Sequence, residues 1–598
     1  MDLINILFPK KNNIDYESLK NCFKLPIEYQ DSCKIIDSNL ICDLELDIFK
    51  NIDLSNAEKS EKIIKKNLYY LLFEPKNNFE ESPISFFNKF YSNDKNYLLD
   101  TQNIINEFKI DNYNFDMNDS SCNYDSIIEN YETIISSDNF IDNYDYINLP
   151  YFSKFNTNEF AMQLWSTYNV LSPLITLLIP IFSLILPFFI IKIQGHDITI
   201  ESYIDHLKNI LQNHALGTLF SDFKNMSFSS SIYIMFTVAL YIFQVYSNFS
   251  SCKKYFHNFK YITESLFNLK NYLNESINNM KLFSNLINDY ITYKSFNDNL
   301  KNIISKLEYF VGKIKYIINR NIYSDYKNYV KIGNLMSDFY SIYNDSKLIS
   351  GLYYSFNFNG YLKNLINIKN LINIDILNKC TFNEDKNTMM KKTSYIGLLD
   401  NKTDKIISND ISLNKNILLT GPNASGKTTF LKGSLFNIIL SQQIGYGFYK
   451  HANIKIYDYF HCYINIPDTN ERDSLFQAEA KKCKKIIDMV KENSDSKHFC
   501  VFDEIFSGTN PQDAIKGGTN YLNYLNKYNN IDYILTTHYN ELCKKIDKNN
   551  IKNLKTKVNK DSKNNFKFTY KIESGINKIN GGIKILKDLE FPEEIIKN

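Results

Sequence analysis

The hydrophobic pattern of the chain is dominated by two apolar stretches. Residues 171–191 carry no charge and are almost wholly apolar, and as a helix they would be about 32 Å long, enough to cross a bilayer. A second uncharged stretch runs over 225–252, with its apolar centre at 232–246. The pattern predicts a membrane hairpin with helices at about 171–191 and 230–247, within a membrane-associated segment 168–250. A buried helical hairpin or an apolar dimer interface stays open as the alternative.

The segments around these stretches have different patterns. After the hairpin segment 151–255, residues 256–386 are polar with helical spacing of their leucines, which predicts the long antiparallel helices of a lever. Residues 387–598 alternate short apolar runs with helical patterns. They predict an α/β domain with a mostly parallel sheet flanked by helices. Residues 1–150 are mixed and rich in asparagine, and we expect a small amino-terminal domain there.

This amino-terminal segment contains an acidic tract. Between Asp111 and Tyr146 the sequence holds nine acidic residues and no lysine or arginine. Such a tract would be repelled by DNA. A solvated acidic face and a protein-binding tail both fit the pattern, so the role of residues 1–150 stays open.

Composition and charge narrow the classes of function. At 598 residues the chain is too long for one core, and its net charge of +2 gives no global basic field that would favour nucleic acid. The ten cysteines form no CxxC pair, so we expect neither zinc nor disulfides. No secretory signal is apparent. The expected localisation is the cytosolic side of a membrane if the hairpin spans it, and otherwise the cytoplasm.

A candidate phosphate-binding loop lies at residues 421–429, between an apolar run at 416–420 and a helical pattern. Its two glycines let backbone N–H groups turn toward phosphate oxygens, Lys427 adds a positive charge, and the Thr428 hydroxyl can bind Mg²⁺. We therefore predict an ATP and Mg²⁺ site with the nucleotide-binding residues Gly421, Pro422, Asn423, Ala424, Ser425, Gly426, Lys427, Thr428 and Thr429.

Two further apolar runs end in residues suited to nucleotide hydrolysis. The run 498–502 is followed by Asp503 and Glu504. Asp503 is predicted to hold Mg²⁺ and Glu504 to orient or deprotonate the attacking water. The run 533–537 is followed by His538, which can sense the terminal phosphate or help to place the water.

These motifs resemble the carboxyl-terminal ATPase of the MutS family, within the wider class of ABC-type ATPases. GPNASGKTTF resembles the family's GPNxxGKST loop, FDEIFSGTNPQDA its DEIGRGTSTYDG segment, and TTHYNEL its THYxEL segment. The segment DSLFQAE at 473–479 resembles the StFxxE signature, whose serine meets the nucleotide of the partner subunit. The resemblance is strong over about 400–598 and fainter over 345–385.

The resemblance implies an ATPase that works as a homodimer with composite sites. It implies Mg²⁺ at Thr428 and Asp503, catalysis at Glu504 with His538, and a contact in trans through Ser474. Arg472, one of only two arginines, lies close to Ser474 in the sequence. We hypothesise that Arg472 reaches phosphate charge across the dimer interface, and a solvated surface arginine is the alternative.

The departures from the family pattern leave two functions open. No mismatch-reading motif is found before residue 150, and an apolar hairpin has no place in an ordinary MutS. In these two features the chain is most similar to truncated, membrane-segment-bearing MutS-like proteins of large DNA viruses and some bacteria. One function is ATP hydrolysis coupled to DNA binding in mismatch repair or recombination, with a lysine-rich run at 544–571 as a phosphate-binding or merely solvated face. The alternative is a membrane-anchored ATPase without mismatch recognition that tethers or remodels at a membrane.

Overall fold

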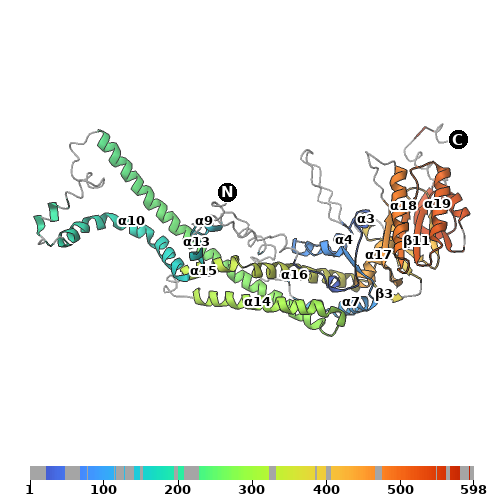
Figure 1. The fold of residues 1–598 in the computed structure, drawn as a ribbon, viewed down its shortest axis with the longest axis horizontal. Helices are drawn as coiled ribbons and strands as arrows, with labels where there is room; N and C mark the ends of the chain where they lie inside the picture. The colour runs from blue at the N-terminus through green and yellow to red at the C-terminus, as the bar shows by residue number, and fades with distance from the viewer. Residues whose placement is uncertain are drawn as a thin grey trace. The chain divides into compact units, whose positions relative to one another are not determined.

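Figure 1 shows the fold in a computed structural model of the chain, which divides into two compact units. The helical unit consists of residues 1–19, 116–277 and 305–352, and the sheet unit of residues 20–115, 278–304 and 353–598. The residues that the structure describes are 22–46, 67–76, 78–113, 115, 127, 140–148, 152–193, 195, 199–201, 203–205, 207, 228–321, 332–383, 387–398, 406–464, 475–546, 549–560, 566–578 and 591–592.

In its described part, the helical unit is built from helices. Three of them, α13, α14 and α16, continue into the sheet unit. The bounds are α9 (Phe140–Asn143), η3 (Ser153–Thr157), α10 (Glu159–Ile193), α13 (Phe228–Leu286), α14 (Lys294–Asn321), α15 (Ile332–Tyr343) and α16 (Ser346–Asn373).

Close approach of backbones fixes α15 against α10. A Cβ atom on Gly333 would lie 2.2 Å from the Cα of Gln163, so a larger residue would force the helices apart. The backbone N–H of Gly333 also donates to Oε1 of Gln163 at 3.0 Å. Beside this contact the core is aromatic, with Phe339 and Tyr343 ring centroids 4.3 Å apart. The contact at Gly333 therefore holds α15 close to α10.

The two apolar stretches form parts of α10 and α13, but they do not support the predicted membrane hairpin. In the part of the chain that the structure describes, no helix is both long and apolar enough to cross a membrane. The prediction of transmembrane helices at 171–191 and 230–247 is corrected on this ground. Polar side chains interrupt both stretches and pair with one another, since Asn248 Nδ2 donates to Thr176 Oγ1 at 2.6 Å and Tyr241 donates to the Thr176 carbonyl at 3.2 Å.

The sheet unit begins with short amino-terminal elements. They include a small antiparallel sheet in which Cys33 pairs with Ser92 and Ile35 with Phe90. The bounds are η1 (Pro26–Tyr29), β1 (Cys33–Ile35), α3 (Ser38–Asp43), α4 (Leu68–Phe73), α5 (Asn78–Glu81), α6 (Ile84–Phe87), β2 (Phe90–Ser92), α7 (Lys95–Glu107) and η2 (Ile110–Asn112), and η4 (Ile291–Tyr293) follows later in the unit. The acidic tract predicted at 111–146 lies largely outside the described residues.

A six-stranded sheet forms the centre of this unit, in the order β13-β12-β6-β11-β10-β9. The five strands β9, β10, β11, β6 and β12 are neighbours in this order and all run parallel. Strand β13 pairs with β12 in antiparallel orientation at one edge. Every residue of β11 is buried, as expected for a central parallel strand. The strands are β6 (Asn416–Thr420), β9 (Tyr459–Tyr463), β10 (His498–Asp503), β11 (Ile531–Thr537), β12 (Ile551–Lys560) and β13 (Phe566–Ser574).

Helices connect these strands, and a second sheet lies in the same unit. The helices are α17 (Lys427–Ile444), α18 (Leu475–Glu492), α19 (Pro511–Leu525) and α20 (Asn540–Lys545). The second sheet has the order β5-β4-β8-β3-β7. Its strands are β3 (Asn378–Asn383), β4 (Met389–Thr393), β5 (Asn409–Ser412), β7 (Tyr446–Gly447) and β8 (His451–Lys455), with η6 (Ile396–Leu398) after β4. The predicted α/β region with a mostly parallel sheet is confirmed.

The amino-terminal elements attach to the carboxyl end of α17 through buried glutamines. Gln443 Nε2 donates to the carbonyls of Phe87 and Phe90, both at 2.7 Å, while its Oε1 accepts from the Tyr69 hydroxyl at 2.7 Å. From the other side, Gln102 Nε2 donates to the carbonyl of Gly445 at 2.6 Å. Elements α4, α6, β2 and α7 therefore contribute to the core of the sheet unit.

Candidate functional site

The loop that joins β6 to α17 has a backbone shape that only small residues allow. Gly426 has φ +91° and directly precedes the first residue of α17. A Cβ on Gly421 would lie 2.3 Å from Thr556 Oγ1 and 2.8 Å from Ser425 Oγ. Gly426 is therefore required for its backbone conformation, and Gly421 is required because a side chain would not fit. The loop sits at the amino end of an 18-residue helix, where free N–H groups and the helix dipole favour an anion.

Lys427, the first residue of α17, points back over this loop. Its side chain is 6% exposed, and Nζ donates to the carbonyls of Gly421 and Pro422 at 3.1 and 3.2 Å. Burial lowers the pKa of the Lys427 ammonium below its ordinary value, while the carboxylate of Glu504, with Oε1 at 3.4 Å, acts in the opposite direction. The lysine is thus held as a single buried cation at the loop.

Strands β10 and β11 bring the predicted acids and the histidine to the same edge. Parallel strands place their carboxyl ends together, so Asp503 at the end of β10 and His538 after β11 meet at the loop. His538 Nε2 lies 2.6 Å from Glu504 Oε1 and 3.4 Å from Lys427 Nζ. Glu504 has φ +55°, a strained backbone for a residue with a side chain. The strained backbone of Glu504 thus lies where the side chains of Lys427, Glu504 and His538 meet.

Asp503 and Thr428 form an oxygen pair suited to a divalent cation. The Thr428 hydroxyl donates to Asp503 Oδ2 at 2.7 Å, and the Thr536 hydroxyl contacts Asp503 Oδ1. Hydroxyl and carboxylate oxygens are the ligands that Mg²⁺ prefers, and Mg²⁺ usually takes few protein ligands and completes its shell with water and phosphate. The residues present therefore fit the predicted Mg²⁺ site.

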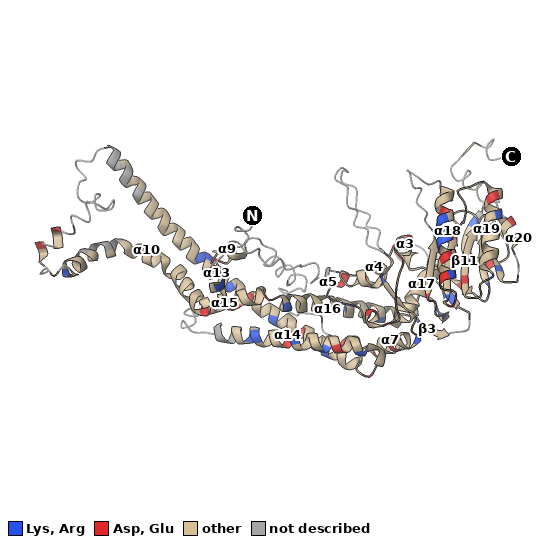
Figure 2. Ribbon diagram, in the orientation of Figure 1, with Lys and Arg blue, Asp and Glu red and all other residues tan. Residues whose placement is uncertain are grey.

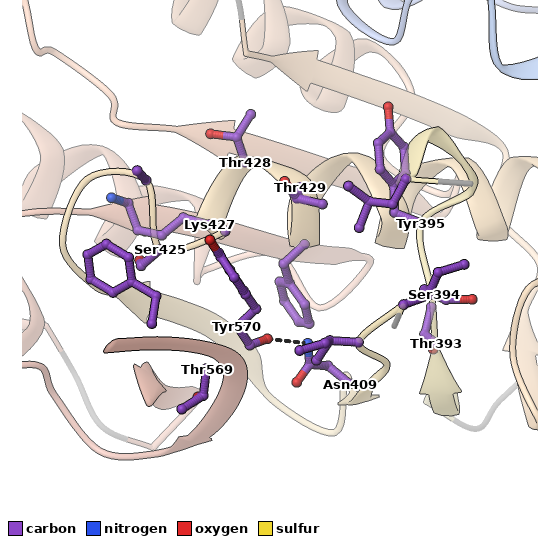
Figure 3. Close-up of a pocket in the computed structure, with 18 of the residues that line it drawn as sticks. Thr393, Ser394, Tyr395, Asn409, Ser425, Lys427, Thr428, Thr429, Thr569 and Tyr570 are labelled. Carbon is purple, nitrogen blue, oxygen red and sulfur yellow. Dashed lines mark hydrogen bonds between the residues drawn. The ribbon is translucent and has the colours of Figure 1, made fainter. Parts of the chain in front are cut away.

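A cavity of about 920 Å³ opens beside the loop (Figure 3). Residues 423–429 line one side of it, and Glu504 reaches it as well. The remaining lining comes from residues outside 421–429: Thr393, Ser394, Tyr395, Leu398, Ile406, Ile407, Asn409, Ile411, Phe430, Gly433, Ser434, Asn559, Lys567, Phe568, Thr569 and Tyr570. Its size is sufficient for a nucleotide.

Tyr570 is one of the cavity residues that the sequence did not predict. Its Cδ1 lies 3.2 Å from the position that a Cβ on Gly426 would take, so the tyrosine lies against the loop. The backbone of Tyr570 has φ +55°, and its carbonyl accepts from Asn409 Nδ2 at 3.0 Å (Figure 3). The alternation of Phe566, Phe568 and Tyr570 could have predicted a strand there, but no local signal ties that strand to the loop.

The signature segment is described only from residue 475 onward. Glu479 of α18 is buried and accepts from the backbone N–H groups of Ser507 and Gly508 at 3.1 and 3.2 Å, and from the Ser507 hydroxyl at 2.8 Å. It thereby fixes the turn that follows Glu504. Arg472 and Ser474 lie outside the described residues, so their predicted contact in trans stays a prediction.

The site lies within a region that other proteins share. A family model described as MutS domain V matches residues 417–598. The DNA mismatch repair protein MutS of Persephonella marina is 28% identical over 211 residues, covering 34% of this chain and 24% of the relative. That of Fusobacterium nucleatum is 30% identical over 276 residues, covering 40% and 30%. That of Prochlorococcus marinus (strain MIT 9301) is 31% identical over 198 residues, covering 32% and 21%.

The chain thus spans less than a third of the length of these relatives. The match nevertheless contains the loop after β6 together with Asp503, Glu504, His538 and Tyr570. The predicted family is confirmed on this basis, whereas the predicted likeness to viral proteins stays a prediction. The carboxyl-terminal region of the chain, residues 417–598, thus matches the MutS family.

Proposed function

We propose that the chain is an ATPase that binds ATP with Mg²⁺ at residues 421–429 and hydrolyses it to ADP and phosphate. The convergence of Lys427, Asp503, Glu504 and His538 at one edge of a parallel sheet is the observation that carries this proposal. A cation, a carboxylate suited to Mg²⁺, and a carboxylate paired with a histidine are the groups that phosphoryl transfer to water requires.

Each residue has a role that follows from its position. The N–H groups of the loop and the Lys427 ammonium hold the β- and γ-phosphates. Mg²⁺, when bound by Thr428 and Asp503, neutralises phosphate charge. Glu504 accepts a proton from the water that attacks the γ-phosphorus while the bond to the ADP oxygen breaks. His538 orients Glu504 through their 2.6 Å contact.

Tyr570 extends the site toward the base of the nucleotide. Its side chain is 49% exposed although it lies against the loop and lines the cavity, so its ring is available to a ligand. An aromatic ring beside a phosphate-binding loop suits stacking with adenine. We propose that Tyr570 stacks on the adenine of ATP.

The partners of this ATPase are proposed from its relatives. The matched proteins carry the name DNA mismatch repair protein, so we propose a homodimer that couples ATP hydrolysis to DNA binding in mismatch repair or recombination. Two lysines of the predicted run at 544–571 are engaged within the protein, since Lys555 pairs with Glu573 at 3.2 Å and Lys571 donates to the Ser408 carbonyl. The alternative of a membrane-anchored ATPase gains no support from the described helices. We propose a cytoplasmic localisation.

Binding of a fluorescent ATP analogue tests the site. Lys427→Ala should abolish detectable binding, because it removes the buried cation at the loop. Lys415→Ala is the matched control, since Lys415 is exposed and immediately precedes β6, at the end of that strand away from the loop. Equal binding by wild type and Lys427→Ala would refute the proposal.

A further inference from the structure

Helix α14 presents tyrosines and lysines on its outer face. Within the helical unit its buried side is apolar, formed by Leu307, Phe310, Ile314 and Ile317. Tyr309 and Tyr316, by contrast, are 68% and 61% exposed. At 3.6 residues per turn both tyrosines lie opposite the buried side, and Lys306 and Lys313 lie beside them, each about one turn from a tyrosine.

Gly312 separates the two tyrosines on this face. It follows Tyr309 by three residues and precedes Tyr316 by four, so all three lie on one side of the helix. Glycine destabilises an exposed helix relative to alanine. No atom outside its own helical turn lies within 4 Å of the position that its Cβ would take, so packing does not require glycine here. Gly312 therefore leaves the helix surface between Tyr309 and Tyr316 without a side chain.

We infer that this tyrosine–lysine face binds a single strand of nucleic acid, with bases stacked on the tyrosines and phosphates paired with the lysines. The face is defined by Lys306, Tyr309, Gly312, Lys313 and Tyr316. Stacking on aromatic side chains needs bases that are not paired, which favours a single strand over a duplex. The seven residues from the first tyrosine to the second span about 10 Å, or about three nucleotides of a stacked strand.

The charge of this part of α14 suits an anionic partner. Residues 305–318 carry three lysines and one glutamate, and Figure 2 shows the basic residues of α14 in blue. Glu308 lies on the flank of the helix away from Lys306 and Lys313, so the cations border the tyrosines on the side where no carboxylate intervenes. A single strand would use both the lysines and the exposed rings, because its phosphates pair with cations and its unpaired bases stack on aromatic side chains.

This inference goes beyond the proposed ATP site and rests on the proposed function only in expecting nucleic acid as a partner. The test uses the full-length protein without nucleotide and a fluorescently labelled oligothymidylate of about 16 nucleotides, followed by anisotropy over a salt series that starts at about 50 mM. The variants are Tyr309→Ala with Tyr316→Ala, Lys306→Gln with Lys313→Gln, and Gly312→Leu. Lys315→Gln is the matched control, because it removes one lysine of the same helix outside the face.

The double variant Tyr309→Ala with Tyr316→Ala should bind the oligonucleotide at least about tenfold more weakly than the wild type does. In the double variant Lys306→Gln with Lys313→Gln, the slope of log K against log salt should be smaller in magnitude by about 1.4. This is the value expected for the loss of two phosphate contacts to a single strand. Gly312→Leu should weaken binding without lowering the melting temperature, since it places a side chain between the two tyrosines but favours the helix. Lys315→Gln should change affinity less than about twofold.

Wild-type protein that does not bind the oligonucleotide, or face variants that bind as the wild type does, would overturn the inference. The variants should bind the fluorescent ATP analogue normally. Failure of the wild type to bind that analogue would instead overturn the proposed ATPase function, so the two failures are distinguishable.

Discussion

Nε2 of His538 lies 2.6 Å from Oε1 of Glu504 at the edge where the central strands end. Burial by itself would raise the pKa of the Glu504 carboxyl, but the hydrogen bond from His538 and the charge of Lys427 outweigh it and hold this pKa below its ordinary value. Glu504 is therefore ionised at neutral pH. It is ready to accept a proton from water without first losing its own.

Removal of His538 should raise the pKa of Glu504 and shift the activity to higher pH. In His538→Ala the hydrogen bond to the carboxylate is lost, so the acid limb of the kcat profile should move toward the ordinary pKa of a glutamate and beyond. Steady-state hydrolysis from about pH 4 to 8 measures this. His538→Gln keeps an N–H donor and should shift the limb less. An acid limb that stays in place in His538→Ala would contradict the assigned role.

Loss of the Thr428 hydroxyl should weaken Mg²⁺ binding. Thr428→Val keeps the shape of the side chain but removes the oxygen that faces Asp503. The Mg²⁺ concentration for half-maximal hydrolysis should rise by roughly tenfold, equivalent to about 1.4 kcal/mol. Thr428→Ser, which retains the oxygen, should behave as the wild type does. If the valine variant needs no more Mg²⁺ than the serine variant, Thr428 is no ligand.

A buried histidine pair should make the sheet unit sensitive to acid. His461 Nε2 lies 3.0 Å from His498 Nδ1, and His498 Nε2 donates to the Asn493 carbonyl at 3.0 Å, so both rings are neutral. Burial and the neighbouring ring lower the pKa of His461 to about 3, and burial lowers that of His498. Below about pH 6.5 the unfolded chain therefore binds protons that the folded chain does not bind. The free energy of unfolding consequently falls as the pH is lowered.

Urea unfolding at two pH values measures this effect. From pH 7.5 to about pH 5 the free energy of unfolding should fall by about 2 kcal/mol on account of His461 alone, and His498 should add to this fall. His461→Asn should reduce the fall, whereas His257→Asn, which replaces an exposed histidine, should leave it unchanged. An identical fall in all three proteins would show that other groups cause it.

Gln443 should be necessary for attachment of the amino-terminal elements. Gln443→Leu would leave the carbonyls of Phe87 and Phe90 and the Tyr69 hydroxyl without their partner inside the protein. The cost should be about 2–4 kcal/mol of unfolding free energy. The exposed Gln477→Leu is the control and should cost less than about 0.5 kcal/mol. Equal stability of the two variants would contradict this account of the attachment.

The sequence was sufficient to predict those parts of the site whose signals are local. The strand, loop and helix around Lys427 lie within thirty consecutive residues or so, and Asp503 and His538 each follow an apolar run directly. Because parallel strands end at one edge, the meeting of these residues followed from the fold class. Their catalytic and binding roles remain predictions.

Other parts depend on contacts between distant segments. Tyr570 lies against Gly426 across more than a hundred residues, and Gln443 binds the carbonyl of Phe87 across more than three hundred. Neither contact has a periodicity or motif that a single sequence displays. The membrane hairpin was predicted wrongly for another reason. Hydropathy along the chain does not show that the polar side chains of Thr176 and Asn248 pair with each other.

ATP hydrolysis by Glu504→Gln tests the central claim most directly. The substitution preserves shape but removes the group that accepts the proton, so Mg²⁺-dependent phosphate release should fall by about 10²–10⁴-fold while binding of a fluorescent ATP analogue stays within about twofold. Wild-type protein that releases no phosphate, or a Glu504→Gln variant as active as the wild type, would contradict the assignment of this site as an ATPase.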